Sequence, residues 1–204
     1  MSRIIIPEIK RRVFLALPLL AGCGLSERPY VERRQWPLAV ARQTALPPRA
    51  AGKVLEIRTL RAGPGLEQRG LQALQADGSI RTGFYEEWAV PPAQGAEEAL
   101  RRWLAESGIF AAVVAPGSRA APDFALEGDL TALWSEPAAR LAHASIAIIV
   151  IAQKPEAGRI VLQRQFSETA ALAADGPQAE MQAMVAALAI ALARIEAALR
   201  GVVA

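Results

Sequence analysis

The chain has one cysteine and one histidine among its 204 residues, and these two scarcities exclude several kinds of site. Because Cys23 stands alone, no intrachain disulfide can form and a metal site built on cysteines is excluded. Because His143 stands alone, a histidine-rich metal centre is excluded as well. We therefore expect no metal site in this chain.

Motifs that hold phosphate groups are also missing. Gly63-Pro64-Gly65, followed by Gly70, lacks the spacing of a dinucleotide-binding loop. No glycine-rich stretch ends in Gly-Lys-Ser or Gly-Lys-Thr, the signature of a nucleotide-binding P-loop. The sequence predicts no bound cofactor, and if the chain serves an ATP-driven machine, it is not the motor.

An excess of positive charge is confined to the start of the chain. The whole sequence has 23 Lys and Arg residues against 20 Asp and Glu residues. The part before Cys23 holds more basic than acidic side chains, namely Arg3, Lys10, Arg11 and Arg12 against Glu8. The remainder therefore carries equal numbers of both signs, and without a basic patch it gives no reason to expect a nucleic-acid partner.

The first 23 residues have the pattern of a secretory signal. A basic head is followed by an apolar run over residues 13–20 and by the small-residue exit Leu20-Ala21-Gly22-Cys23. The run is too short to span a bilayer, which takes about 20 apolar residues. Leu-Ala-Gly-Cys resembles the lipobox of bacterial lipoproteins, in which the cysteine is acylated, for example with palmitate, and the signal is cut just before it. The alternative is an incidental thiol late in an ordinary signal.

The lipobox divides the chain into three parts. We expect a signal peptide over residues 1–22, a lipidated tether over 23–35 and one domain over 36–204. Two or more acyl chains on Cys23 anchor a protein stably, since each buried methylene contributes about 0.8 kcal/mol. Lys10-Arg11-Arg12 fits either twin-arginine export or the general secretion route. Gly24 stands where an acidic residue would indicate retention at the inner membrane, which favours the outer membrane.

The domain is predicted to be α+β, with a mainly antiparallel sheet, an internal helix and a long C-terminal helix packed on it. Helical spacing of apolar residues predicts a helix around residues 96–104, stopped by Gly108, and a second helix over 178–200. A membrane span is the alternative for the second helix. Alternating or continuously apolar patterns predict strands at 36–42, 53–60, 109–114, 124–131, 138–152 and 159–169.

Two features of the strands are more specific. Asp77-Gly78 lies between the strand-like runs 70–76 and 79–89, which predicts a hairpin with a tight type I′ turn. The apolar run 146–151 predicts a strand buried on both faces.

Few side chains are placed for catalysis. Glu127 and Asp129 share one strand face with Asp123 on the same side, and two close carboxylates can divide acid and base roles. His143 can act as a base. We favour the structural interpretation for both: a solvated face for the acids and a histidine at the margin of the sheet. We therefore expect no catalytic residues and no enzyme activity.

Trp88, Trp103 and Trp134 are the candidate partner surface, because aromatic side chains are enriched at interfaces. Core packing is the alternative for each of them, and the one we favour.

The order and spacing of several segments resemble the auxiliary lipoproteins of MCE-type ABC transport systems, the PqiC-like family. The resemblance runs from about Trp36 to Leu199. Besides the lipobox it is carried by residues 52–58, 85–92, 100–104, 107–110 and 124–133, by the hydrophobic strand and by the Ala-rich last helix.

This resemblance implies a function that the residues alone do not. Such proteins are periplasm-facing, non-enzymatic parts of machines that move phospholipid or other apolar cargo between the inner and outer membranes. The implied partners are an MCE-domain protein and the ABC permease and ATPase of the same system. One alternative is an outer-membrane assembly lipoprotein that binds a β-barrel, and another is a cryptic hydrolase using Glu127 and Asp129. The apolar C-terminal helix leaves a homo-oligomer open.

Overall fold

The computed structural model describes residues 30–49, 51–154 and 158–203. The expected signal peptide, its lipobox and Cys23 lie outside these residues. Contacts divide the chain into Met1–Val31 and Glu32–Ala204. The second unit, called the domain below, contains every helix and strand of the described residues.

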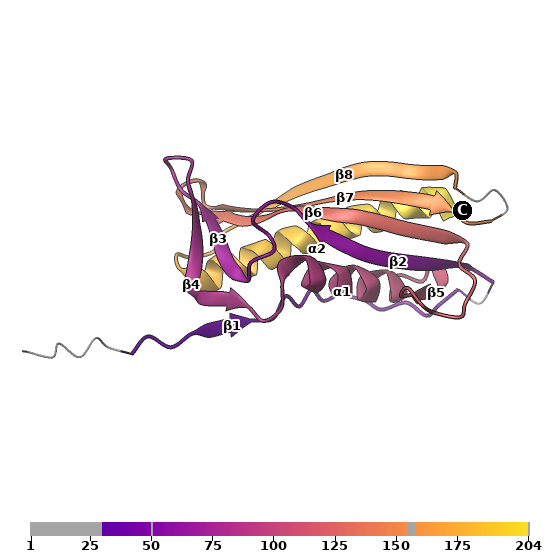
Figure 1. Ribbon diagram of the computed structural model, residues 1–204, viewed down its shortest axis with the longest axis horizontal. Coiled ribbons are helices and arrows are strands. Elements are labelled where there is room, and N and C mark those ends of the chain that lie inside the picture. Colours follow the sequence, from indigo (N-terminus) through magenta and orange to yellow (C-terminus); the bar gives the residue numbers. More distant parts are fainter. Residues whose placement is uncertain (1–29, 50, 155–157, 204) are drawn as a thin grey trace, which may run out of the picture. The chain divides into compact units, whose positions relative to one another are not determined.

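The domain consists of eight strands and two α-helices. In chain order these are β1 (Arg34–Trp36), β2 (Lys53–Ala62), β3 (Gly70–Leu74), β4 (Ile80–Trp88), α1 (Pro92–Ala105), β5 (Phe110–Val114), β6 (Phe124–Glu136), the 3₁₀ turn η1 (Pro137–Ala139), β7 (Leu141–Ala152), β8 (Ile160–Ala171) and α2 (Pro177–Val203). The predicted fold class, α+β with an internal and a long C-terminal helix, is confirmed (Figure 1).

All eight strands belong to one mixed sheet centred on β6. Along one edge β6 pairs antiparallel with β7, and β7 pairs antiparallel with β8. Along its other edge β6 pairs parallel with β2 and, farther along, with β3. β2 in turn pairs parallel with β5. β3 pairs antiparallel with β4, and β1 adds to β4 in parallel. The two longest pairings, β6–β7 and β7–β8, are thus antiparallel, while β2, β3, β5 and β1 each make parallel pairings.

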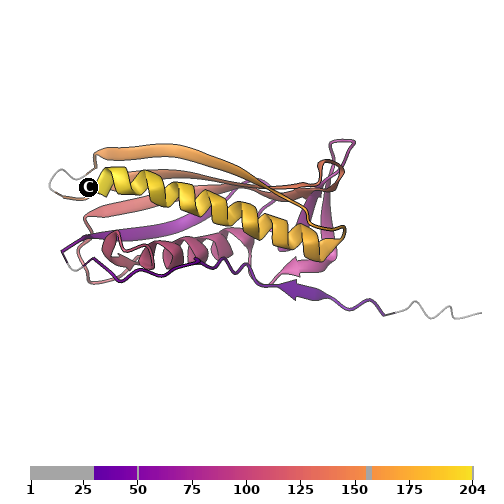
Figure 2. The same cartoon turned by 180° about the vertical axis from the view of Figure 1, so that it is seen from behind.

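Both helices lie on the same face of the sheet, so the domain has two layers (Figure 2). α2 packs across β8, β7 and β6, and α1 packs on β2 and β5. The core forms between them from fully buried side chains such as Leu126, Ile146, Leu100, Met184 and Leu192. Pro92 takes the first position of α1, where a missing N–H is tolerated. The other face of the sheet, which no described helix covers, is called the open face.

α2 is long and apolar enough, by length and composition, to cross a membrane, and among the described residues it is the one helix that is. Half of its most apolar window is nevertheless buried inside the domain. Its inward side chains, including Leu188, Leu192 and Ile195, are fully buried against the strands. This packing matches the domain-covering helix that the sequence favours.

The first strand differs from our prediction. We expected it at residues 36–42, but β1 ends at Trp36. The segment after it still alternates, with Leu38 and Val40 buried between exposed neighbours. Leu38 packs on Gly95 of α1, so the alternation reflects burial against helices and no strand pairs with the segment.

The hairpin β3–β4 lies where we predicted, but its turn is different. Gln75 N–H donates to the carbonyl of Ser79, and Gly78 N–H donates to the carbonyl of Gln75. The loop therefore has three residues, 76–78. Gly78 has φ of +84°, whereas Asp77 is not among the positive-φ residues. This is a type I turn with a glycine bulge and not the type I′ turn, which needs positive φ at two positions.

The long apolar strand also departs from the prediction in two ways. It begins at Leu141 and not at 138, because Pro137–Ala139 form a 3₁₀ turn that Arg140 ends with φ of +54°. Its run 146–151 alternates between buried and half-buried side chains, so it is not buried on both faces. Ile146, Ile148 and Val150 face the helices, while Ile149 and Ile151 lie on the open face.

Candidate functional site

A groove of about 850 Å³ crosses the open face over β2, β6, β7 and β8. Its floor is apolar and comes from β7, with Ala147 and Ile149 half-buried. Its walls are polar. The lining residues are Arg58, Thr59, Arg61, Pro116, Glu127, Gly128, Asp129, Ala147, Ile148, Ile149, Gln163, Arg164 and Gln165.

A bulge in β2 shapes one wall of the groove. The register between β2 and β6 shifts between Ile57 and Leu60, so Arg58 and Thr59 together face a shorter stretch of β6. The N–H of Leu60 is satisfied by a carboxylate oxygen of Glu97 in α1 at 3.0 Å. The bulge therefore turns two polar side chains toward the groove without leaving that N–H unpaired.

The two candidate catalytic carboxylates are held in ion pairs on this wall. Asp129 accepts two hydrogen bonds from Arg61, at 2.6 Å from Nε and 2.9 Å from Nη2. Glu127 accepts a hydrogen bond from Arg58, which also donates to Glu56 at 3.2 Å. The hydrogen bond to Glu56 raises the pKa of Arg58 above its ordinary value, and the one to Asp129 raises the pKa of Arg61. Both guanidinium groups therefore stay cationic at physiological pH.

The third predicted carboxylate, Asp123, plays a structural part. It precedes β6 and accepts a hydrogen bond from the backbone N–H of Val54 at 2.8 Å. Lys53 Nζ lies 3.9 Å from its other oxygen. Asp123 thus joins the starts of β2 and β6, and it is not among the residues that line the groove.

A second, aromatic part of the open face lies farther along β6 and β7. Trp134 and His143 are direct partners in the two strands, and their ring centroids are 6.2 Å apart. His143 Nε2 lies 2.9 Å from a carboxylate oxygen of Glu136. Trp134 is half-buried, so one part of its ring stays accessible. Of the three candidate tryptophans, this one lies on the open face.

The other two tryptophans are placed differently. Trp88 is 1% exposed in the core, so it is removed from the candidate partner surface. It is the last residue of β4 and pairs with Trp36 of β1. Trp103 is half-buried on α1 and donates from Nε1 to Glu196 at 2.8 Å.

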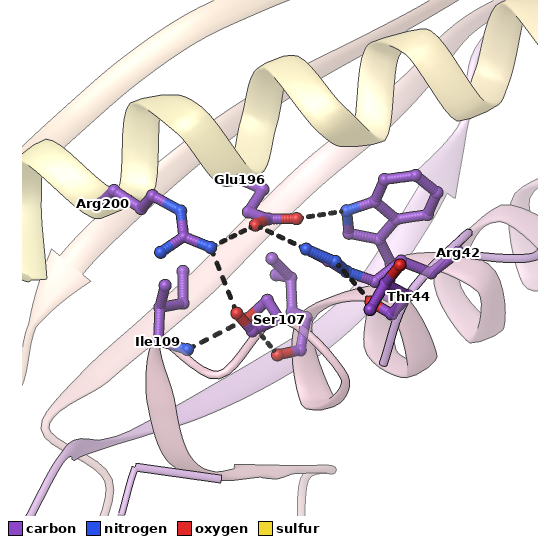
Figure 3. A network of polar contacts seen from close by, with 8 residues as sticks. Arg42, Thr44, Ser107, Ile109, Glu196 and Arg200 are labelled. Atoms are coloured by element: carbon purple, nitrogen blue, oxygen red, sulfur yellow. Dashed lines mark hydrogen bonds and ion pairs between the residues drawn. The ribbon is translucent and has the colours of Figure 1, made fainter. Parts of the chain in front are cut away.

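Glu196 is the centre of a polar cluster that the sequence did not reveal (Figure 3). Its carboxylate accepts hydrogen bonds from Arg42 at 3.1 Å and from Arg200 at 2.6 Å, besides the one from Trp103. Arg200 also donates to the carbonyl of Ser107 at 3.2 Å. The cluster ties α2 to α1 and to the segment after β1. The signal available in the sequence was the interruption of the apolar helix by Arg194, Glu196 and Arg200.

The described residues offer no grouping of three or more His, Cys, Asp or Glu side chains that could hold a metal ion. What the open face can do chemically is bind. An apolar floor between fixed charges is suited to a protein or lipid surface, since apolar contact gives affinity and the charges give orientation.

Comparison with known proteins adds the family. The family model described as "ABC-type transport auxiliary lipoprotein component" matches residues 37–199. No curated protein sequence matches the chain significantly.

Solved structures share the fold at low sequence identity. A protein of Xanthomonas campestris assigned to the DUF330 family has a TM-score of 0.61 at 21% identity, with 80% of this chain and 90% of that chain covered. A hypothetical protein of Chlamydia trachomatis has a TM-score of 0.54 at 11% identity, covering 75% and 98%. A crystal structure of an uncharacterised protein gives 0.62 at 15% identity, covering 76% and 95%. At these identities the likeness speaks for the fold alone.

Proposed function

The chain belongs to the family of ABC-type transport auxiliary lipoprotein components, and from this premise we propose that it is the accessory subunit of an MCE-type ABC transport system. As a lipoprotein component of a transport system it is a protein of the cell envelope. The proposal adds a periplasm-facing position at the outer membrane and a cargo of phospholipid or another apolar molecule. The single observation that carries it is the family match across residues 37–199.

The proposed mechanism is positional. Acylated Cys23 holds the domain at its membrane, and the open face of the sheet docks the MCE-domain partner, which brings the lipid. The accessible apolar strip of β7, with Ala147 and Ile149 between fixed ion pairs, supports this role for the open face. The permease and the ATPase of the same system supply the energy.

We further propose that the chain has no enzymatic activity of its own. Asp129 and Glu127 are engaged by Arg61 and Arg58, and His143 by Glu136. In this proposal the three groups serve as structural ion pairs and hydrogen bonds of the sheet face. Replacing Glu127 and Asp129 together with Ala while transport continues unchanged would support this part of the proposal.

The decisive experiment is affinity capture of the tagged full-length chain from its native envelope in mild detergent, with partners identified by mass spectrometry. Recovery of an MCE-domain protein, with or without permease and ATPase, supports the proposal. Recovery of an outer-membrane β-barrel and no ABC component replaces it with an assembly role.

The anchor is tested separately by Cys23→Ala. We expect this variant to leave the membrane fraction, because the acyl chains supply the binding energy and the thiol is their attachment point. Cys23→Ala that still fractionates with the outer membrane would overturn the anchor.

A further inference from the structure

β4 contains an irregularity that turns two aromatic side chains outward. Gly70 of β3 pairs with Glu87, and Gln72 pairs with Thr82, so residues 83–86 of β4 face Leu71 alone. We call residues 83–86 the β4 bulge. Bulges of this kind re-aim side chains that a regular strand would direct elsewhere.

The side chains of the β4 bulge are unusually exposed for their type. Phe84 is 67% exposed and Tyr85 is 44% exposed. Their rings contact each other edge to face, with centroids 4.9 Å apart. Ile80, at the start of the same strand, is 47% exposed. Grouped exposed apolar side chains on one element mark a contact surface more often than scattered single ones do.

Positive charge accompanies the two rings. The guanidinium of Arg33 lies over the face of Phe84, 4.9 Å from its centroid. Arg33 also pairs with Glu87 at 3.2 Å and remains 46% exposed. Arg34, the first residue of β1, is 63% exposed at 4.0 Å from Glu86. Aromatic rings beside arginine stems form the combination found where proteins contact the interfacial region of bilayers.

The covalent chain limits how far this surface lies from the proposed anchor. Cys23 precedes Arg33 by only ten residues. A chain of ten residues spans at most about 36 Å when it is fully extended. Since Arg33 touches Phe84, a bilayer that holds Cys23 is within this distance of the β4 bulge.

We propose that the β4 bulge is a second membrane contact, in which Phe84, Tyr85 and Arg33 enter the phospholipid headgroup layer. This inference rests on the proposed acylation of Cys23, which brings the surface to the membrane. Two separate contacts restrain the domain in a way that one flexible tether does not. The open face is then presented to a partner in a fixed orientation.

A single fluorescent label tests the contact. Acylation consumes the only native thiol, so Tyr85→Cys supplies one free thiol for an environment-sensitive dye such as NBD. Ile160→Cys on β8, where the native side chain is 53% exposed, is the matched control. Both acylated full-length proteins are reconstituted into vesicles of phosphatidylethanolamine and phosphatidylglycerol, with a nitroxide-labelled phospholipid as quencher. No transport partner is present.

We expect the label at position 85 to shift to the blue and to lose most of its fluorescence to the nitroxide lipid, while the label at position 160 stays bright. Adding Phe84→Ser to the Tyr85→Cys chain should restore much of the fluorescence. Ile190→Ser, at a side chain 41% exposed on α2, should restore none.

Other outcomes separate the possible failures. Protein that floats with the vesicles but shows equal, unquenched labels overturns the second contact and leaves the anchor standing. Protein that does not float overturns the anchor, and the inference with it. A label at 85 that is shielded from aqueous iodide yet untouched by the nitroxide lipid overturns the membrane contact in favour of a second copy of this chain, the only protein present, that covers the β4 bulge.

Discussion

The indole N–H of Trp103 and the carboxylate of Glu196 meet at 2.8 Å across the junction of α1 and α2. This bond joins two residues that are 93 positions apart in the chain. Since Arg42 binds the same carboxylate, one nearly buried acid holds together three segments. The side chain of Glu196 is 9% exposed and that of Arg42 is 14% exposed, so water compensates little if one partner is lost.

Glu196→Ala is therefore expected to destabilise the domain by about 3 kcal/mol, because it leaves the guanidinium of Arg42 buried without a counter-charge. Urea unfolding followed by tryptophan fluorescence measures the change. Arg194→Ala is the control on the same helix. Arg194 is 66% exposed at 3.5 Å from Glu168, and removing such a surface pair should cost less than about 1 kcal/mol. Equal losses in the two variants would contradict this role of the cluster.

The surroundings of two helical glycines predict that Gly→Ala changes the stability of the domain in opposite directions at the two positions. A Cβ at Gly95 in α1 would lie 2.8 Å from Cδ2 and 2.9 Å from Cβ of Leu38. A Cβ at Gly201 in α2 would meet nothing within 4 Å. Gly95→Ala should destabilise by about 1–3 kcal/mol through overpacking. Gly201→Ala should stabilise by up to about 1 kcal/mol, because alanine is the better helix former.

Chemical denaturation of the two glycine variants, compared with the native chain, gives both signs in one experiment. If Gly95→Ala proves as stabilising as Gly201→Ala, then the segment after β1 is not packed against α1 as described.

The turn of the β3–β4 hairpin gives a prediction about pH. Asp77 accepts hydrogen bonds from Ser79 Oγ at 2.7 Å and from Ser79 N–H at 2.9 Å. Both hydrogen bonds lower the pKa of Asp77 below its ordinary value, the one from the side chain of Ser79 more than the one from its backbone. A carboxyl whose pKa is lowered by folding contributes stability above its unfolded pKa, and this contribution is lost as the pH falls through the folded pKa.

NMR titration of the Asp77 side chain should therefore show a midpoint below that of a model aspartate. Ser79→Ala should move the midpoint upward, toward the model value, while Ser79→Thr, which keeps the hydroxyl, should leave it low. A midpoint unaffected by Ser79→Ala would show that the hydroxyl is not the cause.

Particular elements show what the sequence could predict and what it could not. The hairpin was predicted because Asp77-Gly78 lies between two strand-like runs. The turn type was not, because it depends on backbone angles and on loop length, and Asp-Gly occurs in both two-residue and three-residue loops. Buried and exposed side chains do alternate at residues 36–42. An extended segment packed against a helix shows the same two-residue alternation of burial as a strand in a sheet, so the pattern did not distinguish the two. The order β5-β2-β6-β7-β8 follows from long-range pairing, which local patterns do not encode.

The candidate site, too, was predicted from the sequence only in part. Glu127 and Asp129 were correctly expected on one face of their strand, and His143 was expected to share a face of its own strand with Ala147, because strand residues two apart share a face. Their partners Arg58, Arg61 and Glu136 were not anticipated. Arg58 and Arg61 come from β2, 69 and 68 positions away in the chain, and a bulge sets their register. The cluster around Glu196 was missed for the same reason, since Arg42 is 154 positions away.

The proposed docking role of the open face leads to the most direct functional prediction. Ala147 lies on the floor of the groove between Asp129 on β6 and Gln165 on β8. Ala147→Glu would place an unpaired carboxylate beside Asp129, and desolvating such a charge on binding costs well over 1.4 kcal/mol. We therefore expect capture of the transport partner to fall by about tenfold or more.

The matched control for Ala147→Glu is the same substitution at Ala186, an exposed alanine on α2 that belongs to the helical layer. Ala186→Glu should leave capture unchanged, since α2 lies on the opposite face of the sheet from the groove. Circular dichroism of both purified variants shows whether each remains folded. Partner recovery, normalised to the amount of anchored protein, then separates the two faces. Loss of capture with Ala186→Glu alone would transfer the docking role from the open face to the helices.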